Sequence, residues 1–292
     1  MSWQTRGLTL PDVRGRPLDA LQQVALVVAV YAIYSAVRAL SSDAADVAVA
    51  QAQDIVRWQR QWGLYWEPDI QAWTTESLTV THIANTVYFW FHLPLLAVFA
   101  VWMFFADRQR FRILRNVWAI TQLIAVAVYF LYPVAPPRLL PESYGFVDTM
   151  AQLSPINYSS AEAGPLMNQY AAFPSLHFAW SVLIAVGFYQ TLPWRPARLL
   201  ALLFPLASFW SIVGTGNHYV ADALGGAAVV TVSFLVAPAL DRLLARPSPA
   251  LTRLPSARRS RSRSRSPGRR SSRPPRLSSG QTRARGLSAA QR

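Results

Sequence analysis

Six apolar segments constrain the fold of this 292-residue chain more than any other feature. Each is long enough for a helix to cross a bilayer, whose hydrocarbon core of about 30 Å needs roughly 20 apolar residues. A helix also satisfies its backbone hydrogen bonds internally, as an apolar environment requires. We therefore predict an all-α integral membrane protein, a six-transmembrane helix bundle with spans at about 21–40, 79–105, 113–132, 175–192, 197–213 and 219–240.

The positive charge of the chain is concentrated in its last part. The formal net charge is +14, yet residues 1–240 hold 13 arginines and 13 acidic residues. We divide the chain into an N-terminal segment (1–20), the membrane domain (21–240) and an Arg/Ser-rich tail (241–292). The tail has too few apolar residues for a core, so we expect it to be disordered. Clustered arginines beside a span favour anionic lipid headgroups over RNA, so we expect no nucleic-acid partner.

The arginines also predict the orientation of the spans. The N-terminus, the turns at 106–116 and 193–198 and the tail are rich in arginine, whereas the loops on the opposite side are acidic. Cytoplasmic loops carry the excess of positive residues. We therefore expect a multi-pass protein of the cell membrane with both termini in the cytoplasm and the long loop 133–172 outside.

Residues 47–77 differ from the spans because five aromatic residues, four of them Trp, alternate with charged residues. Such a pattern is typical of an amphipathic segment at the headgroup level. It favours an aromatic belt over a lid or a lipid-entry collar.

A short polar stretch, residues 173–177, begins the fourth apolar segment. Proline is tolerated in the first turn of a helix, so Pro174 is predicted to be the first helical residue. Ser175 and His177 then lie in the opening turn, where free amides and the positive end of the helix dipole favour an anion.

A second polar stretch, residues 216–222, precedes the last apolar segment. His218 and Asp222 are four residues apart and therefore share one face of a helix. A carboxylate that accepts one ring N–H leaves the other ring nitrogen free as a base, a nucleophile or a metal ligand. The two stretches together favour phosphoryl transfer, with one histidine attacking and the other protonating the leaving group.

These stretches resemble the second and third signature motifs of the phosphatidic acid phosphatase type 2 superfamily. The resemblance covers roughly residues 50–240 and is closest to the inositol phosphorylceramide synthase-like branch, which also carries a segment like 132–138. It implies that His218 is the nucleophile that forms a phosphohistidine, that Asp222 orients it, and that His177 is the general acid.

The chain departs from the family pattern at its cations. The first motif, Lys-x6-Arg-Pro, is missing because the chain contains no lysine, and Ser211-Ile212 stands where the third motif has Ser-Arg. Arg138 is the cation that remains for phosphate, and its planar guanidinium suits phosphate oxygens.

Three further residues are assigned to substrate binding beside Arg138. Ser175 belongs to the anion-binding turn, and Asn217 precedes the nucleophile. His92 lies within an apolar segment, where a polar side chain faces a cavity or the bundle interior. Either substrate contact or an interhelical hydrogen bond would satisfy it, and Pro94 is expected to kink the helix there.

The function implied is a membrane-embedded lipid phosphotransferase that acts without a cofactor or metal on a phospholipid or polyprenyl phosphate. If water replaces the alcohol acceptor, the same intermediate makes the protein a lipid-phosphate phosphatase. A zinc site formed by His177, His218 and Asp222 is a competing interpretation. A transporter or membrane scaffold is a non-enzymatic alternative.

Overall fold

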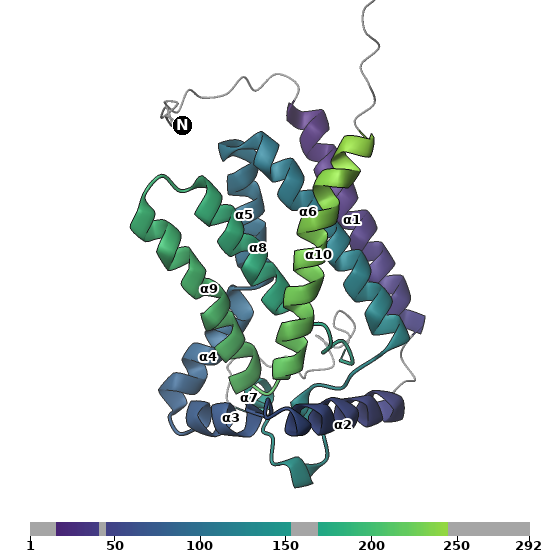
Figure 1. The fold of residues 1–292 in the computed structure, drawn as a ribbon, viewed down its shortest axis with the longest axis vertical. Coiled ribbons are helices and arrows are strands. Elements are labelled where there is room, and N and C mark those ends of the chain that lie inside the picture. Colours follow the sequence, from purple (N-terminus) through teal and green to yellow (C-terminus); the bar gives the residue numbers. More distant parts are fainter. Residues whose placement is uncertain (1–15, 41–44, 153–168, 245–292) are drawn as a thin grey trace, which may run out of the picture. The chain divides into compact units, whose positions relative to one another are not determined.

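The structure, a computed structural model, describes residues 16–40, 45–152 and 169–244. These residues form helices and connecting segments, with one isolated bridge between Val134 and Ala171 and no strand, which confirms the all-α prediction. Most of the predicted segment 1–20 and tail 241–292 lies outside the described residues. The helices are α1 (Arg16–Leu40), α2 (Ala45–Gln61), α3 (Glu67–Thr75), α4 (Leu78–Trp90), α5 (Leu93–Ala106), α6 (Arg108–Leu131), α7 (Thr149–Gln152), α8 (Leu176–Thr191), α9 (Arg195–Gly214) and α10 (Val220–Leu244) (Figure 1).

Three of these helices are long and apolar enough to cross a membrane, namely α6, α9 and residues Val220–Leu240 of α10. The pair α4 and α5 forms a fourth candidate, bent by 46° at the break that contains His92. The predicted kink near Pro94 is therefore confirmed. The structure supports three or four of the six predicted spans, because α8 has 16 residues and the apolar part found in α1 is Ala20–Val30.

The core of the bundle lies where α8 packs against α9 and α10, and α10 packs against α6. Its buried side chains include Met103, Leu114 and Ile184. A side chain at Gly226 would collide with the carbonyl oxygen of Ser175, so the glycine lets α10 approach the start of α8 closely. Close approach of two helices at a small residue is common in membrane proteins.

The Trp-rich stretch 47–77 forms two helices, α2 and α3, that lie across one end of the bundle (Figure 1). They meet at Gly63, whose φ of 67° is in the left-handed region. Four exposed tryptophans line these helices and their junction, namely Trp58, Trp62, Trp66 and Trp73.

Two connections differ from their predictions. The stretch 106–116 is not a turn, because Asp107 caps α6 directly by accepting a hydrogen bond from the backbone N–H of Arg110 at 3.0 Å. The arginines of the stretch 106–116 therefore lie in the first turns of α6. Within the long loop 133–172, the described residues form two 3₁₀ turns, Pro137–Leu139 and Glu142–Tyr144, and the short helix α7.

Candidate active site

The two polar stretches come together at one end of the bundle, where α8 and α10 begin and α9 ends (Figure 1). The backbone N–H of Ser175 donates to the carbonyl oxygen of Asp222 at 2.9 Å. From α6, the hydroxyl of Tyr129 donates to the carbonyl oxygen of Pro174 at 2.8 Å. The start of α8 is thus fixed to both α10 and α6.

Helix α8 begins at Leu176, two residues later than predicted, so Pro174 lies outside it. The reason is the side chain of Ser175, which acts as the N-cap and accepts from the backbone N–H of Phe178 at 3.3 Å. His177 still lies in the first turn. The buried Ser175 hydroxyl therefore makes its hydrogen bond to the helix itself.

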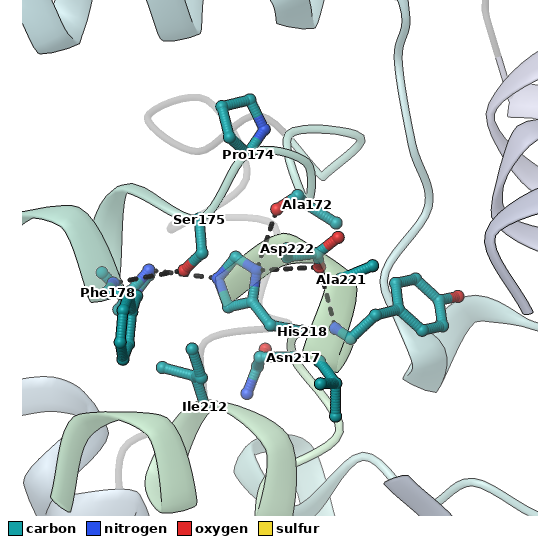
Figure 2. A network of polar contacts seen from close by, with 12 residues as sticks. Ala172, Pro174, Ser175, Phe178, Ile212, Asn217, His218, Ala221 and Asp222 are labelled. Carbon is teal, nitrogen blue, oxygen red and sulfur yellow. Dashed lines mark hydrogen bonds and ion pairs between the residues drawn. The ribbon is translucent and has the colours of Figure 1, made fainter. Parts of the chain in front are cut away.

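His218 is buried, and its hydrogen bonds define its tautomer (Figure 2). The Nδ1 atom lies 2.9 Å from the carbonyl oxygen of Ala172 and 3.2 Å from Oδ2 of Asp222. A carbonyl oxygen only accepts hydrogen bonds, so Nδ1 carries the proton and Nε2 keeps a lone pair. Asp222 is itself held, because its Oδ2 also accepts from the backbone N–H of Tyr219 at 2.8 Å.

The lone pair of His218 faces the second histidine. Its Nε2 lies 3.2 Å from Nδ1 of His177. Because His218 Nε2 is the acceptor, His177 Nδ1 is the donor of this hydrogen bond. A phosphate group does not fit between two nitrogen atoms at this distance. In-line transfer between them therefore requires one ring to turn about its side-chain bonds.

An aromatic cluster from the break between α4 and α5 surrounds His177. The ring of Tyr88 stacks on His177 with centroids 4.4 Å apart, and the ring of His92 contacts His177. The His92 ring also lies 5.0 Å from Trp180. In the part of the chain that the structure describes, the contacts of His92 are thus with rings, and the interhelical hydrogen bond considered for it is replaced by aromatic packing.

Arg138 is attached to the turn that carries His218. Its Nη1 donates to Oδ1 of Asn217 at 2.6 Å, and its backbone N–H donates to the carbonyl oxygen of Gly216 at 3.0 Å. Its Nε lies 3.2 Å from Oδ2 of Asp148. Asn217 thus holds the predicted phosphate-binding arginine, while its own amide donates to Thr215 Oγ1 at 2.8 Å.

The segment 132–138 positions the site through its backbone as well. The N–H of Val134 donates to the carbonyl oxygen of Tyr170 at 2.8 Å, and the N–H of Ala172 donates to the carbonyl oxygen of Val134 at 3.2 Å. This pairing fixes the Ala172 carbonyl that orients His218. The chain turns directly after α9, and Gly216 adopts a left-handed φ of 73° there.

Two residues that the sequence analysis did not single out clamp the start of α10. Oε1 of Glu67 accepts from the backbone N–H of Val220 at 2.6 Å and from Nε2 of Gln59 at 2.8 Å. Oε1 of Gln59 accepts from the N–H of Ala221 at 2.7 Å. Both side chains are fully buried, and burial raises the pKa of Glu67 despite these hydrogen bonds. We call this pair the Gln59–Glu67 clamp.

The geometry disfavours the zinc site considered for this trio. Asp222 lies on the Nδ1 side of the His218 ring and His177 lies on the Nε2 side, so their ligand atoms do not converge on one point. More generally, the described residues contain no group of three His, Cys, Asp or Glu side chains arranged to hold a metal ion. The arrangement instead places the lone pair of His218 Nε2 against the Nδ1–H of His177.

Comparison with known proteins places the chain in a family. A family model described as PAP2 superfamily matches residues 53–236, a stretch that contains every residue of the site described above. No curated protein and no solved structure matched the chain.

Proposed function

Since the chain belongs to the PAP2 superfamily, we propose that it transfers a head-group phosphoryl from a membrane lipid through a phosphohistidine on His218. The observation that supports this most strongly is the orientation of the His218 ring. Ala172 and Asp222 hold the proton on Nδ1, and the free lone pair of Nε2 points at His177. This is the arrangement of an activated nucleophile beside an acid.

The first step forms a bond between His218 Nε2 and phosphorus and breaks the bond from phosphorus to the leaving oxygen. Protonated His177 gives its proton to that oxygen, so an alcohol leaves instead of an alkoxide. The His218 ring gains positive charge as its lone pair is used. Asp222 stabilises that charge through Nδ1.

The second step restores the site. The oxygen of an acceptor alcohol attacks phosphorus, neutral His177 takes its proton, and the bond to Nε2 breaks and returns its electron pair to His218. Arg138 and the amides of the first turn of α8 bind the phosphoryl oxygens. Each such donor lowers the barrier by about 3 kcal/mol.

The acceptor separates two activities. We favour an alcohol acceptor, and therefore a transferase similar to the inositol phosphorylceramide synthase-like branch. Water in the same step gives a lipid-phosphate phosphatase that acts on phosphatidate or a polyprenyl phosphate. The proposed mechanism uses no metal or cofactor.

We also propose the membrane arrangement expected from the sequence, with six spans, both termini in the cytoplasm and the site at the extracytoplasmic end. The exposed tryptophans of α2, α3 and their junction support it, because these two helices lie across the end of the bundle where α8 and α10 begin. Tryptophan is enriched at the membrane–water interface, at the level of the lipid headgroups.

Turnover with and without an acceptor tests the proposal. The purified protein is given radiolabelled phosphatidylinositol, phosphatidate or polyprenyl phosphate, alone and with an added lipid alcohol. We expect labelled transfer product, lost in His218→Ala and kept in His82→Ala. His82 is the matched control because it is exposed. Equal turnover by both variants would reject the role proposed for His218, and a wild type without turnover would favour the transporter or scaffold.

A further inference from the structure

The phosphate-binding arginine of this site is paired with a carboxylate. Nε of Arg138 lies 3.2 Å from Oδ2 of Asp148, and both side chains are largely buried, at 19% and 22% exposure. The same guanidinium reaches Asn217, next to His218. One negative charge therefore stands directly beside the positive charge that would receive a phosphate.

Asp148 is built into the site and cannot easily move away. Its Oδ1 accepts from the backbone N–H groups of Met150 at 3.1 Å and Ala151 at 3.0 Å, which makes it the cap of α7. Oδ1 thus holds the backbone while Oδ2 faces Arg138.

Two buried carboxamides fix the backbone on either side of Asp148. Gln71 bonds both the N–H and the carbonyl oxygen of Val147, each at 2.9 Å. Asn85 donates to the carbonyl oxygen of Thr149 at 3.0 Å and accepts from its hydroxyl at 2.8 Å. The carboxylate is therefore held at a constant distance from the guanidinium.

The fixed pair lowers the positive charge available to the substrate. A phosphomonoester carries about two negative charges near pH 7, because its second pKa is about 6. A phosphodiester carries one. We propose that Asp148 is a specificity-determining residue that favours phosphodiester head groups over dianionic lipid phosphomonoesters. This inference rests on the proposed function and selects within its donors.

Asp148→Asn is the informative variant, because asparagine caps a helix as well as aspartate does and carries no charge. We compare kcat/KM for phosphatidylinositol, a diester, with that for phosphatidate, a monoester. The ratio of the two kcat/KM values should shift toward phosphatidate by about tenfold. Phosphatidate carries one negative charge more than phosphatidylinositol, and the repulsion between that charge and the Asp148 carboxylate corresponds to about tenfold at about 6 Å and an effective dielectric constant of about 40.

Two further variants isolate the charge of Asp148. Asp148→Ser also keeps a capping side chain and should shift the preference in the same direction. Glu142→Gln removes an exposed carboxylate from the same connection and should leave the preference unchanged. An unchanged preference in folded Asp148→Asn, or an equal shift in Glu142→Gln, would overturn the proposal. Loss of the fold in both Asp148 variants would make the residue structural and would overturn it too.

A binding experiment tests this inference independently of the proposed function. Methyl phosphate and dimethyl phosphate are matched dianionic and monoanionic probes, and their protection of the protein against thermal unfolding requires no turnover. Asp148→Asn should bind dimethyl phosphate about tenfold and methyl phosphate about 100-fold more tightly, so that the ratio of the two affinities changes by about tenfold. If binding shifts in this way but no lipid phosphate is turned over, the inference about Asp148 holds and the proposed enzymatic function is rejected. If lipid phosphate is turned over but neither the substrate preference nor the binding of the phosphate probes shifts in Asp148→Asn, only the inference about Asp148 is rejected.

Discussion

His218 Nε2 and His177 Nδ1 lie 3.2 Å apart, although His177 belongs to α8 and His218 lies in the turn before α10, 41 residues further along the chain. The contact follows from the hydrogen bond that ties Ser175 at the start of α8 to Asp222 in the first turn of α10. Any change that loosens these helix starts should therefore act on both imidazoles together.

The Gln59–Glu67 clamp should matter for both stability and turnover. Glu67→Ala leaves the N–H of Val220 and the amide of Gln59 without their acceptor, at a cost of about 1–3 kcal/mol for each. The start of α10 then shifts, and a displacement of about 1 Å lowers kcat up to roughly 100-fold. Denaturant unfolding in detergent and turnover measure the two effects.

Glu67→Gln is the conservative counterpart, because its oxygen can still accept both hydrogen bonds. It should keep most of the turnover that Glu67→Ala loses. Glu76→Ala, at an exposed position of the same region, serves as the control and should change neither quantity. Equal losses in the Ala and Gln variants would contradict a role based on hydrogen bonding.

The buried Glu67 also predicts a pH dependence. Burial raises its pKa in the folded protein above the ordinary value of 4.5. Its contribution to stability is therefore complete below pH 4.5 and is lost as the pH rises through the folded pKa. The unfolding free energy of the wild type, minus that of Glu67→Gln, should fall as pH rises over this range. A flat or rising difference in chemical unfolding experiments would contradict this prediction.

Gly216 should not tolerate a side chain. At its φ of 73° an added Cβ would lie 2.7 Å from Nε2 of Gln71 and 2.9 Å from the carbonyl oxygen of Val147. Gly216→Ala combines the cost of a left-handed residue, about 1–2 kcal/mol, with that of overpacking, about 1–3 kcal/mol. Because the turn carries Asn217 and His218, activity should also be lost.

Gly63→Ala is the matched control for that experiment. Gly63 has a similar φ of 67° but open space around it, so the variant should lose only about 1–2 kcal/mol and keep activity. Thermal unfolding and turnover of the two variants are compared side by side. Equal effects would show that crowding at Gly216 is unimportant.

A chelator should leave the reaction unchanged. The proposed nucleophile is a ring nitrogen and the proposed acid is an imidazole, so neither step needs a Lewis acid. Turnover is measured before and after prolonged dialysis against EDTA, with zinc added back. A loss of turnover that zinc restores would favour the metal-dependent alternative.

Local patterns in the sequence predicted what lies within a few residues of each motif. The apolar segments predicted the helical class, and the spacing of His218 and Asp222 predicted their contact. The shared helix face was wrong, because α10 begins at Val220 and His218 lies in the turn before it. The start of α8 was misplaced because proline and serine both fit a helix start, and the serine side chain supplies the cap. The six-span count remains a proposal.

The residues that hold the start of α10, next to His218, could not be found in this way. Glu67 is 153 residues from Val220, and Gln59 is 162 residues from Ala221. In an amphipathic, charge-rich stretch, nothing distinguishes these two polar residues from those that face solvent. The carbonyl of Ala172 carries no side-chain signal, and the pairing of Arg138 with Asp148 depends on how the loop folds back.

Trapping the phosphoryl group on the protein tests the central claim most directly. The enzyme is quenched in alkali during turnover of a phosphorus-labelled donor, and the modified residue is located by mass spectrometry. We predict an alkali-stable, acid-labile phosphoryl group on Nε2 of His218, missing in His218→Ala and present in His82→Ala. Continued turnover by His218→Ala, or a label on any other residue, would contradict the account.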